Sequence, residues 1–147
     1  MSQILAPSTA AAPALPDEVK ALHPLVGRLL SDRGYAFLAA PADAAGLDAR
    51  DHILFLPAYG KNHLETPDIA AVLPELVKEL GGAAEIGGAV AGPKTEAALR
   101  DAMSLALPAL VVVRAGEPIG SVARMRDWDE YLARLNAILA TPSNLAH

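Results

Sequence analysis

The clearest pattern of apolar positions lies in residues 107–122. Leu110 begins a run of four apolar residues, three of them valines, which favours a central strand buried on both faces. Residues 115–118 then supply a glycine and a proline for a tight turn that returns the chain antiparallel. Pro108 stands just before the strand, where its missing N–H removes no hydrogen bond from the sheet. The stretch therefore predicts a buried strand followed by a hairpin.

Three further strands are predicted upstream. Residues 52–57 are an apolar run without alternation, which indicates a second central strand. Residues 84–90 predict a strand weakened by glycines, and residues 35–38 a short one. Residues 40–50 are rich in Ala, Asp and Gly and predict a loop or a weak helical turn.

The longest helix is predicted to follow the strand at 52–57, after a polar loop. Thr66 is expected to cap its N-terminus, with Pro67 at the first helical position and Gly81 beyond its end. Pro74 lies inside this helix, where it removes one backbone hydrogen bond and predicts a kink. The apolar stripe of the helix consists of Ile69, Val72, Leu73, Leu76, Val77 and Leu80.

Two other helices are predicted to begin at prolines. Pro24 begins a helix that ends before Gly34, and Pro93 begins another that leads into the hairpin. The last helix is predicted to start at Asp127, because Glu130 three residues later completes a capping-box pattern. Its buried stripe is predicted to consist of Trp128, Tyr131, Leu132, Leu135, Ile138 and Leu139.

The alternation of strands and helices predicts an α/β fold, a mixed sheet with helices on both faces. Strands joined through helices are expected to be parallel neighbours with right-handed crossovers, and the hairpin adds an antiparallel edge. The length of 147 residues suits one domain. We expect this domain to span residues 17–140, between a flexible N-terminal tail of residues 1–16 and a C-terminal tail of residues 141–147.

Composition excludes several classes of function. The net charge of -5 argues against a nucleic-acid partner. The absence of cysteine excludes disulfides, thiolate metal sites and cysteine-based redox catalysis. No Lys or Arg precedes Lys20, so the positive region of a secretory signal is missing. The longest apolar run, residues 102–113, is shorter than the roughly 20 residues that span a bilayer. We therefore expect a cytoplasmic protein without membrane insertion.

The order of the elements and the positions of the prolines resemble the thioredoxin fold over nearly the whole chain. The resemblance implies a thioredoxin-like three-layer sandwich, with a central mixed β-sheet flanked by helices. If Pro74 is aligned with the kink proline of the thioredoxin active-site helix, Thr66 and Ile69 stand where thioredoxins carry their two redox cysteines. Leu107 and Pro108 fall where that fold has a cis-proline beside the active site. Without the resemblance, an ordinary trans proline is the alternative.

Four segments resemble a more specific group, the HyaE/HupG/HoxO hydrogenase maturation proteins, namely residues 23–26, 67–76, 107–120 and 126–131. These are thioredoxin-like, cysteine-poor proteins. The resemblance implies a chaperone in the assembly of a nickel-iron uptake hydrogenase. It also implies a partner, the precursor of the iron-sulfur small subunit with its twin-arginine signal peptide. Other hydrogenase maturation proteins and a second copy of the chain remain open as partners.

The same resemblance points to one end of the sheet as the binding surface. A cis bond at Pro108 would leave a backbone edge open for an extended peptide, and the polar loop at 59–65 would form a lip beside it. The alternative for this loop is an ordinary solvated surface. The predicted peptide- and partner-binding residues are Tyr59, Lys61, His63, Glu65, Thr66, Asp68, Leu107 and Pro108.

Charged side chains add a second prediction. Carboxylates near the loop and along the long helix would suit a pair of arginines, because guanidinium binds carboxylate bidentately; a solvated helix face is the alternative. These carboxylates are Glu65, Asp68, Glu75 and Glu79. Three arginines near the hairpin either contact an acidic part of a partner or serve solubility alone. They are Arg114, Arg124 and Arg126.

Motifs for metal or cofactor binding are not found. The four histidines lack the spacing of a metal site, and no Gly-rich phosphate loop is present, so neither a metal nor a cofactor is predicted. The leading hypothesis is therefore a non-catalytic chaperone. The alternative is a redox-inactive scaffold or dimerisation module that holds other maturation factors. A third hypothesis, an enzyme with non-cysteine chemistry, would depend on His63 or Asp68.

Overall fold

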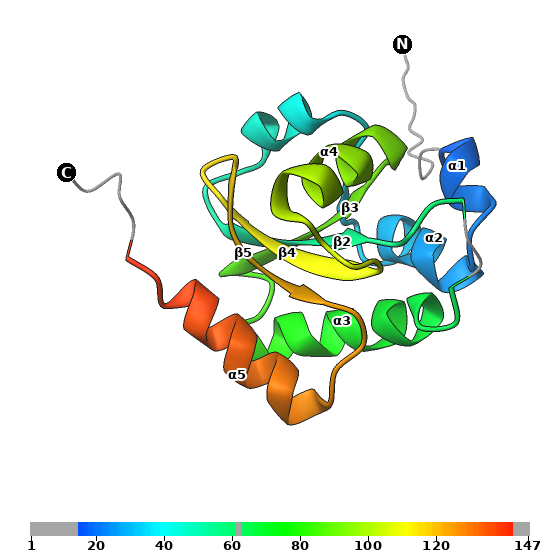
Figure 1. Ribbon diagram of the computed structural model, residues 1–147. Helices are drawn as coiled ribbons and strands as arrows, with labels where there is room; N and C mark the ends of the chain where they lie inside the picture. The colour runs from blue at the N-terminus through cyan, green and yellow to red at the C-terminus, as the bar shows by residue number, and fades with distance from the viewer. Residues whose placement is uncertain (1–14, 61–62, 143–147) are drawn as a thin grey trace, which may run out of the picture.

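A five-stranded mixed sheet with helices on both faces forms the centre of the computed structural model, which describes residues 15–60 and 63–142 (Figure 1). The strands are β1 (Ala36–Leu38), β2 (Asp51–Leu56), β3 (Ile86–Ala91), β4 (Ala109–Arg114) and β5 (Glu117–Ala123). The helices are α1 (Asp17–Lys20), α2 (Pro24–Ser31), the 3-10 helix η2 (Pro41–Gly46), α3 (Thr66–Leu80), α4 (Pro93–Met103) and α5 (Trp128–Leu139). This is the three-layer α/β architecture that the resemblance implies.

The strand order is β1-β3-β2-β4-β5. β2 pairs parallel with β3, as predicted for strands joined through a helix, and β1 pairs parallel with the other side of β3. The prediction is wrong for β4, which pairs antiparallel with β2 although α4 precedes it. Ala109 pairs with Leu56, so β4 begins at the end of the sheet where β2 and β3 finish. Residues 104–108 return the chain to that end after α4, starting from a left-handed residue, Ser104 (φ 54°).

Side chains of β2 and β4 are buried on both faces, which confirms the two predicted central strands. On one face Ile53 and Phe55 pack with α2, α3 and α5. On the other face Leu54 and Val111 belong to a smaller cluster, to which α4 and η2 contribute partly buried side chains. Figure 1 shows α3 and α5 below the sheet and α4 above it. The core is thus two apolar layers separated by the sheet.

Helix α3 contains Pro74 as predicted, but Thr66 does not cap it. The N-cap residue is Glu65, and its side chain makes no capping hydrogen bond. Thr66 is buried, and its Oγ1 donates to the carbonyl of Pro57 at 2.9 Å. A threonine at this position can either cap its own helix or donate its hydroxyl to a neighbouring segment. Here the carbonyl of Pro57, just after β2, lies close enough to accept the hydrogen bond.

Helix α5 starts one residue after Asp127, but two expectations about it are wrong. The side chain of Asp127 makes no capping hydrogen bond. Glu130 instead faces Arg134 at 2.9 Å and Arg126 at 3.9 Å. Trp128 is 40% exposed, whereas Tyr131 is fully buried. A residue on an apolar stripe is buried only where a neighbouring element covers it. Trp128 is the first residue of the helix, and it is only partly covered there.

Two adjacent glycines in β3 make room for two aromatic rings, one from β2 and one from the residue just before β1. A methyl group on Gly87 would lie 2.4 Å from the ring of His52, its partner across the sheet. A methyl group on Gly88 would lie 2.4 Å from the ring of Tyr35. The rings of His52 and Tyr35 occupy the space that side chains at these two positions would need. The strand therefore requires glycine here, although glycine weakens the strand pattern in the sequence.

None of the helices in the described ranges has the length and apolar character that a membrane crossing requires.

Candidate functional site

The predicted binding surface lies at the end of the sheet where β2 stops, α3 begins and β4 starts. The Leu107–Pro108 bond is cis, as the resemblance implies. Pro108 is buried, whereas Leu107 is half-buried. The carbonyl of Pro108 accepts a hydrogen bond from the backbone N–H of Arg124 at 2.7 Å. The proline loop is therefore joined to the segment that connects β5 to α5.

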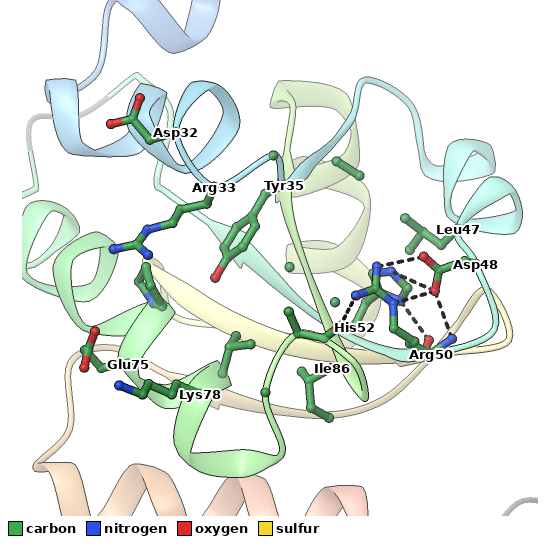
Figure 2. Close-up of a pocket in the computed structure, with 18 of the residues that line it drawn as sticks. Asp32, Arg33, Tyr35, Leu47, Asp48, Arg50, His52, Glu75, Lys78 and Ile86 are labelled. Atoms are coloured by element: carbon green, nitrogen blue, oxygen red, sulfur yellow. Dashed lines mark hydrogen bonds and ion pairs between the residues drawn. The ribbon is translucent and has the colours of Figure 1, made fainter. Parts of the chain in front are cut away.

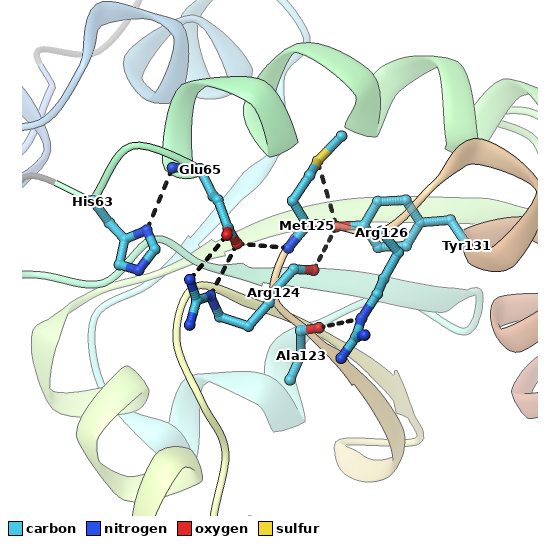
Figure 3. Close-up of polar contacts among 7 residues, drawn as sticks. All are labelled: His63, Glu65, Ala123, Arg124, Met125, Arg126 and Tyr131. Atoms are coloured by element: carbon cyan, nitrogen blue, oxygen red, sulfur yellow. Dashed lines mark hydrogen bonds and ion pairs between the residues drawn. The ribbon is translucent and has the colours of Figure 1, made fainter.

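A bidentate ion pair links that connecting segment to the start of α3 (Figure 3). Arg124 Nε donates to Glu65 Oε1 and Arg124 Nη2 donates to Oε2, both at 2.9 Å. The backbone N–H of Met125 adds a third hydrogen bond to Oε1 at 2.8 Å. Donation from the Arg124 guanidinium lowers the pKa of the Glu65 carboxyl to about 2, with help from the Met125 amide. Glu65 is therefore an anion held by two neighbours.

The backbone of Arg124 is fixed independently of its side chain. Its φ of 67° lies in the left-handed region, which a residue other than glycine seldom adopts. Its carbonyl accepts a hydrogen bond from the buried hydroxyl end of Tyr131 at 2.8 Å. Burial raises the pKa of the Tyr131 phenol to about 12, so this hydroxyl stays a donor at neutral pH. Pro108, Glu65 and Tyr131 thus converge on one residue.

The loop after β2 is anchored from the opposite face by Glu96 of α4. Its buried carboxylate accepts hydrogen bonds from the backbone N–H groups of Ala58 at 2.6 Å and Tyr59 at 2.8 Å. Burial raises the pKa of Glu96, and these two amides oppose the rise. The hydroxyl of Tyr59 donates to the carbonyl of Ala91 at 2.6 Å. Sequence reasoning missed Glu96, because a glutamate in the first turn of a helix also suits a solvated surface.

The remaining predicted residues differ in how far a partner could reach them. Thr66 is buried, whereas Asp68 is exposed on the first turn of α3. His63 is half-buried, and its Nδ1 accepts the N–H of Glu65 at 3.3 Å. Lys61 lies outside the described residues. Leu64, which sequence reasoning did not select, is 88% exposed; a leucine in a polar loop gave the only signal.

A shallow groove runs beside these residues, between the loop and the connection from α1 to α2. Its volume is about 400 Å³. His63 and Leu64 lie on one side, and Leu22 and His23 on the other, with Pro67 of α3 completing it. The groove is mainly apolar, with imidazole groups at two positions. It is a concave surface at the predicted end of the sheet.

The predicted group of arginines near the hairpin divides into separate contacts. Arg114 pairs with Asp51 at 2.8 Å and also donates to carbonyls at the end of α5. Arg126 Nε donates to the carbonyl of Ala123 at 2.8 Å. Arg124 pairs with Glu65, which among residues 15–60 and 63–142 is the one predicted arginine-binding carboxylate that contacts an arginine.

A larger cavity of about 790 Å³ lies at the opposite end of the sheet (Figure 2). Arg33 and Tyr35 border it on one side, and Glu75 and Lys78 of α3 on the other. Charges of both signs line it, so it has no clear preference for an anion or a cation. Within the ranges 15–60 and 63–142, no cluster of three or more potential metal-ligating side chains was found.

Comparison with known proteins identifies the family. Residues 25–131 match the family model described as "Hydrogenase-1 expression protein HyaE". The chain is 39% identical over 121 residues to the hydrogenase expression/formation protein HupG of Rhodobacter capsulatus, covering 80% of this chain and 86% of that protein. It is 34% identical over 125 residues to HoxO of Azotobacter vinelandii, covering 81% of this chain and 80% of that protein.

Solved structures agree on the fold. The thioredoxin of Fasciola hepatica superimposes with a TM-score of 0.51 at 21% identity, covering 67% of this chain and 97% of that one. Desulfothioredoxin from Desulfovibrio vulgaris Hildenborough gives a TM-score of 0.52 at 18% identity, covering 69% and 96%. At these identities the likeness establishes the thioredoxin fold alone. The match over residues 25–131, together with these relatives, shows that the chain belongs to the family of the hydrogenase-1 expression protein HyaE.

Proposed function

We propose that this protein is a non-catalytic chaperone in hydrogenase maturation, which binds the precursor of the iron-sulfur small subunit in the cytoplasm before export. The observation that carries the proposal is membership in a family whose relatives are named hydrogenase expression and formation proteins. The twin-arginine signal peptide of the precursor is the segment that we expect to be recognised.

The chemistry of the site supports binding rather than catalysis. If Pro74 is aligned with the kink proline of thioredoxins, Thr66 and Ile69 correspond to the two cysteines, and both are buried. The Thr66 hydroxyl is already bound to Pro57. What remains accessible is an apolar groove, the exposed Leu64 and a carboxylate at Glu65. These features suit a peptide that carries apolar and cationic side chains.

Isothermal titration calorimetry with a synthetic twin-arginine signal peptide tests the proposal. We expect binding that weakens at high salt and when the two arginines are replaced by lysines, because lysine cannot pair bidentately. Leu64→Ser, which removes exposed apolar surface without adding a charge, should weaken binding, whereas Glu75→Gln, at the opposite cavity, should not. Absence of binding both to the peptide and to the whole precursor would refute the proposal.

The cavity at the opposite end of the sheet favours a second candidate, a scaffold that holds other maturation factors or a second copy of the chain. Affinity capture with light scattering separates the two functions. A scaffold retains other maturation proteins, or dimerises, without retaining the precursor. Lys78→Glu rather than Leu64→Ser should disturb it.

A further inference from the structure

We propose that Glu65 is a binding site for a guanidinium group of the partner and that Arg124 occupies this site as an internal competitor until the partner binds. The inference rests on the proposed function, because it takes an arginine-bearing peptide as the ligand. It goes further by naming the residue that recognises the arginine and the residue that limits the affinity.

The contact between the two side chains shows that the carboxylate is already shaped for a guanidinium. Each oxygen of Glu65 accepts one nitrogen of Arg124 at 2.9 Å, which is the fork geometry of bidentate recognition. The side chains are 31% and 41% exposed, so a partner can approach both. A second arginine could therefore replace the first without opening the core.

The carboxylate remains in place when Arg124 leaves. The N–H of Met125 donates to Glu65 Oε1 and holds the side chain at the start of α3. The backbone of Arg124 is held separately, through its N–H to Pro108 and its carbonyl to Tyr131. Only the arginine side chain has to move, and within residues 15–60 and 63–142 all its hydrogen bonds go to Glu65.

A second arginine pair in the same molecule shows the contrast. Arg114 and Asp51 are 18% and 21% exposed, and Arg114 also donates to the carbonyls of Leu139 and Thr141. Displacing Arg114 would uncap the end of α5. Displacing Arg124 breaks one exposed ion pair, which is the weaker class of interaction. Of these two pairs, Glu65–Arg124 is therefore the one that can exchange its arginine.

The affinity of the Arg124→Gln variant for the twin-arginine peptide tests the competition. Glutamine keeps the Cβ, and so the same backbone strain at this position, but removes the guanidinium. We expect Arg124→Gln to bind the peptide about fivefold more tightly, because the peptide no longer has to displace a partly exposed ion pair. Arg124→Lys keeps the charge without the fork, so it should give a smaller gain. Glu65→Gln should weaken binding about tenfold.

Arg126→Gln is the matched control. It removes the same charge two residues away, but Arg126 bonds to the carbonyl of Ala123 and not to Glu65. Any gain from lowering the general positive charge appears in both variants, so the difference between them reports the competition. The amide resonance of Met125 gives a second readout. It should keep the chemical shift of a hydrogen-bonded amide when the peptide binds, because an arginine that replaces Arg124 leaves this amide bonded to Glu65.

The outcomes separate the two proposals. If Arg124→Gln binds no more tightly than Arg126→Gln while the wild-type protein binds the peptide, the inference is wrong and the proposed function stands. Retained affinity in Glu65→Gln also overturns the inference. If the wild-type protein and Arg124→Gln both fail to bind peptide and precursor, the proposed function fails. A circular dichroism melt of each variant establishes that it is folded.

Discussion

The hydroxyl of Tyr131 donates a 2.8 Å hydrogen bond to the backbone carbonyl of Arg124, a residue in the left-handed region of backbone conformation. The tyrosine is fully buried on α5, and the arginine is the first residue after strand β5, before the turn into that helix. The bond therefore sets the direction in which the chain leaves the sheet. It also determines where the Arg124 side chain emerges, and hence that it meets Glu65.

Tyr131→Phe should lower the free energy of unfolding by about 1–2 kcal/mol, because the carbonyl of Arg124 loses its buried donor. Urea unfolding followed by circular dichroism measures the change. Tyr35→Phe is the control, since no hydrogen bond of the Tyr35 hydroxyl is recorded within residues 15–60 and 63–142. Equal losses in both variants would contradict the role of Tyr131.

The Glu65–Arg124 pair should make stability depend on pH in the acid range. The pKa of Glu65 is about 2 in the folded protein, below the usual 4.5. A lowered folded-state pKa contributes stability above pH 4.5 that is lost as the pH falls towards 2. The difference in unfolding free energy between wild type and Glu65→Gln should therefore shrink over this range. A constant difference from pH 6 to pH 3 would show that the ion pair contributes nothing.

Gly120→Ala should destabilise the protein by about 1–3 kcal/mol through overpacking. A methyl group at Gly120 would lie 2.8 Å from Cγ1 and Cγ2 of Ile138 on α5. Gly46→Ala is the control, because a methyl group there meets nothing within 4 Å. Thermal unfolding measures both. Ile138→Ala removes both of these atoms, so the losses of Gly120→Ala and Ile138→Ala should be less than additive in the double variant. Additive losses would point to the backbone instead.

Trp128 should contribute little to stability although it lies on the apolar stripe of α5. Trp128→Ala is expected to change the unfolding free energy by about 0.5 kcal/mol, because 40% of the residue is exposed. Leu135→Ala, at a fully buried position of the same helix, should cost about 2–5 kcal/mol. Trp128 is the single tryptophan of the chain, so acrylamide quenching of its fluorescence gives an independent measure of exposure. Strong protection from acrylamide would contradict this placement.

The sequence predicted which elements meet at this end of the sheet better than it predicted their side-chain contacts, and the binding role of these residues stays a prediction. The proline loop, the start of α3 and Glu65 lie at the predicted end of the sheet. Two contacts of the site could not be predicted from the sequence. Arg124 and Glu65 are 59 residues apart, and no local pattern relates such positions. Glu96 binds the loop at Tyr59 across 37 residues, so its role depends on how α4 packs.

The sequence by itself determined the elements whose causes are local. Runs of apolar residues specified β2 and β4, and prolines marked the helix starts at Pro24 and Pro93. These features need only nearest neighbours along the chain. The absence of cysteine excluded thiol chemistry in the same direct way.

The tertiary structure alone decided the direction of β4, the exposure of Trp128 and the partner of Glu65. Each depends on which segments meet in space. The end at which a strand enters a sheet depends on the path of the preceding chain, and the burial of an apolar residue depends on whether another element covers it. The partner of a charge depends on which side chain the fold brings within hydrogen-bonding distance. At Glu65 that partner is Arg124, held in place by the packing of α5 against the sheet.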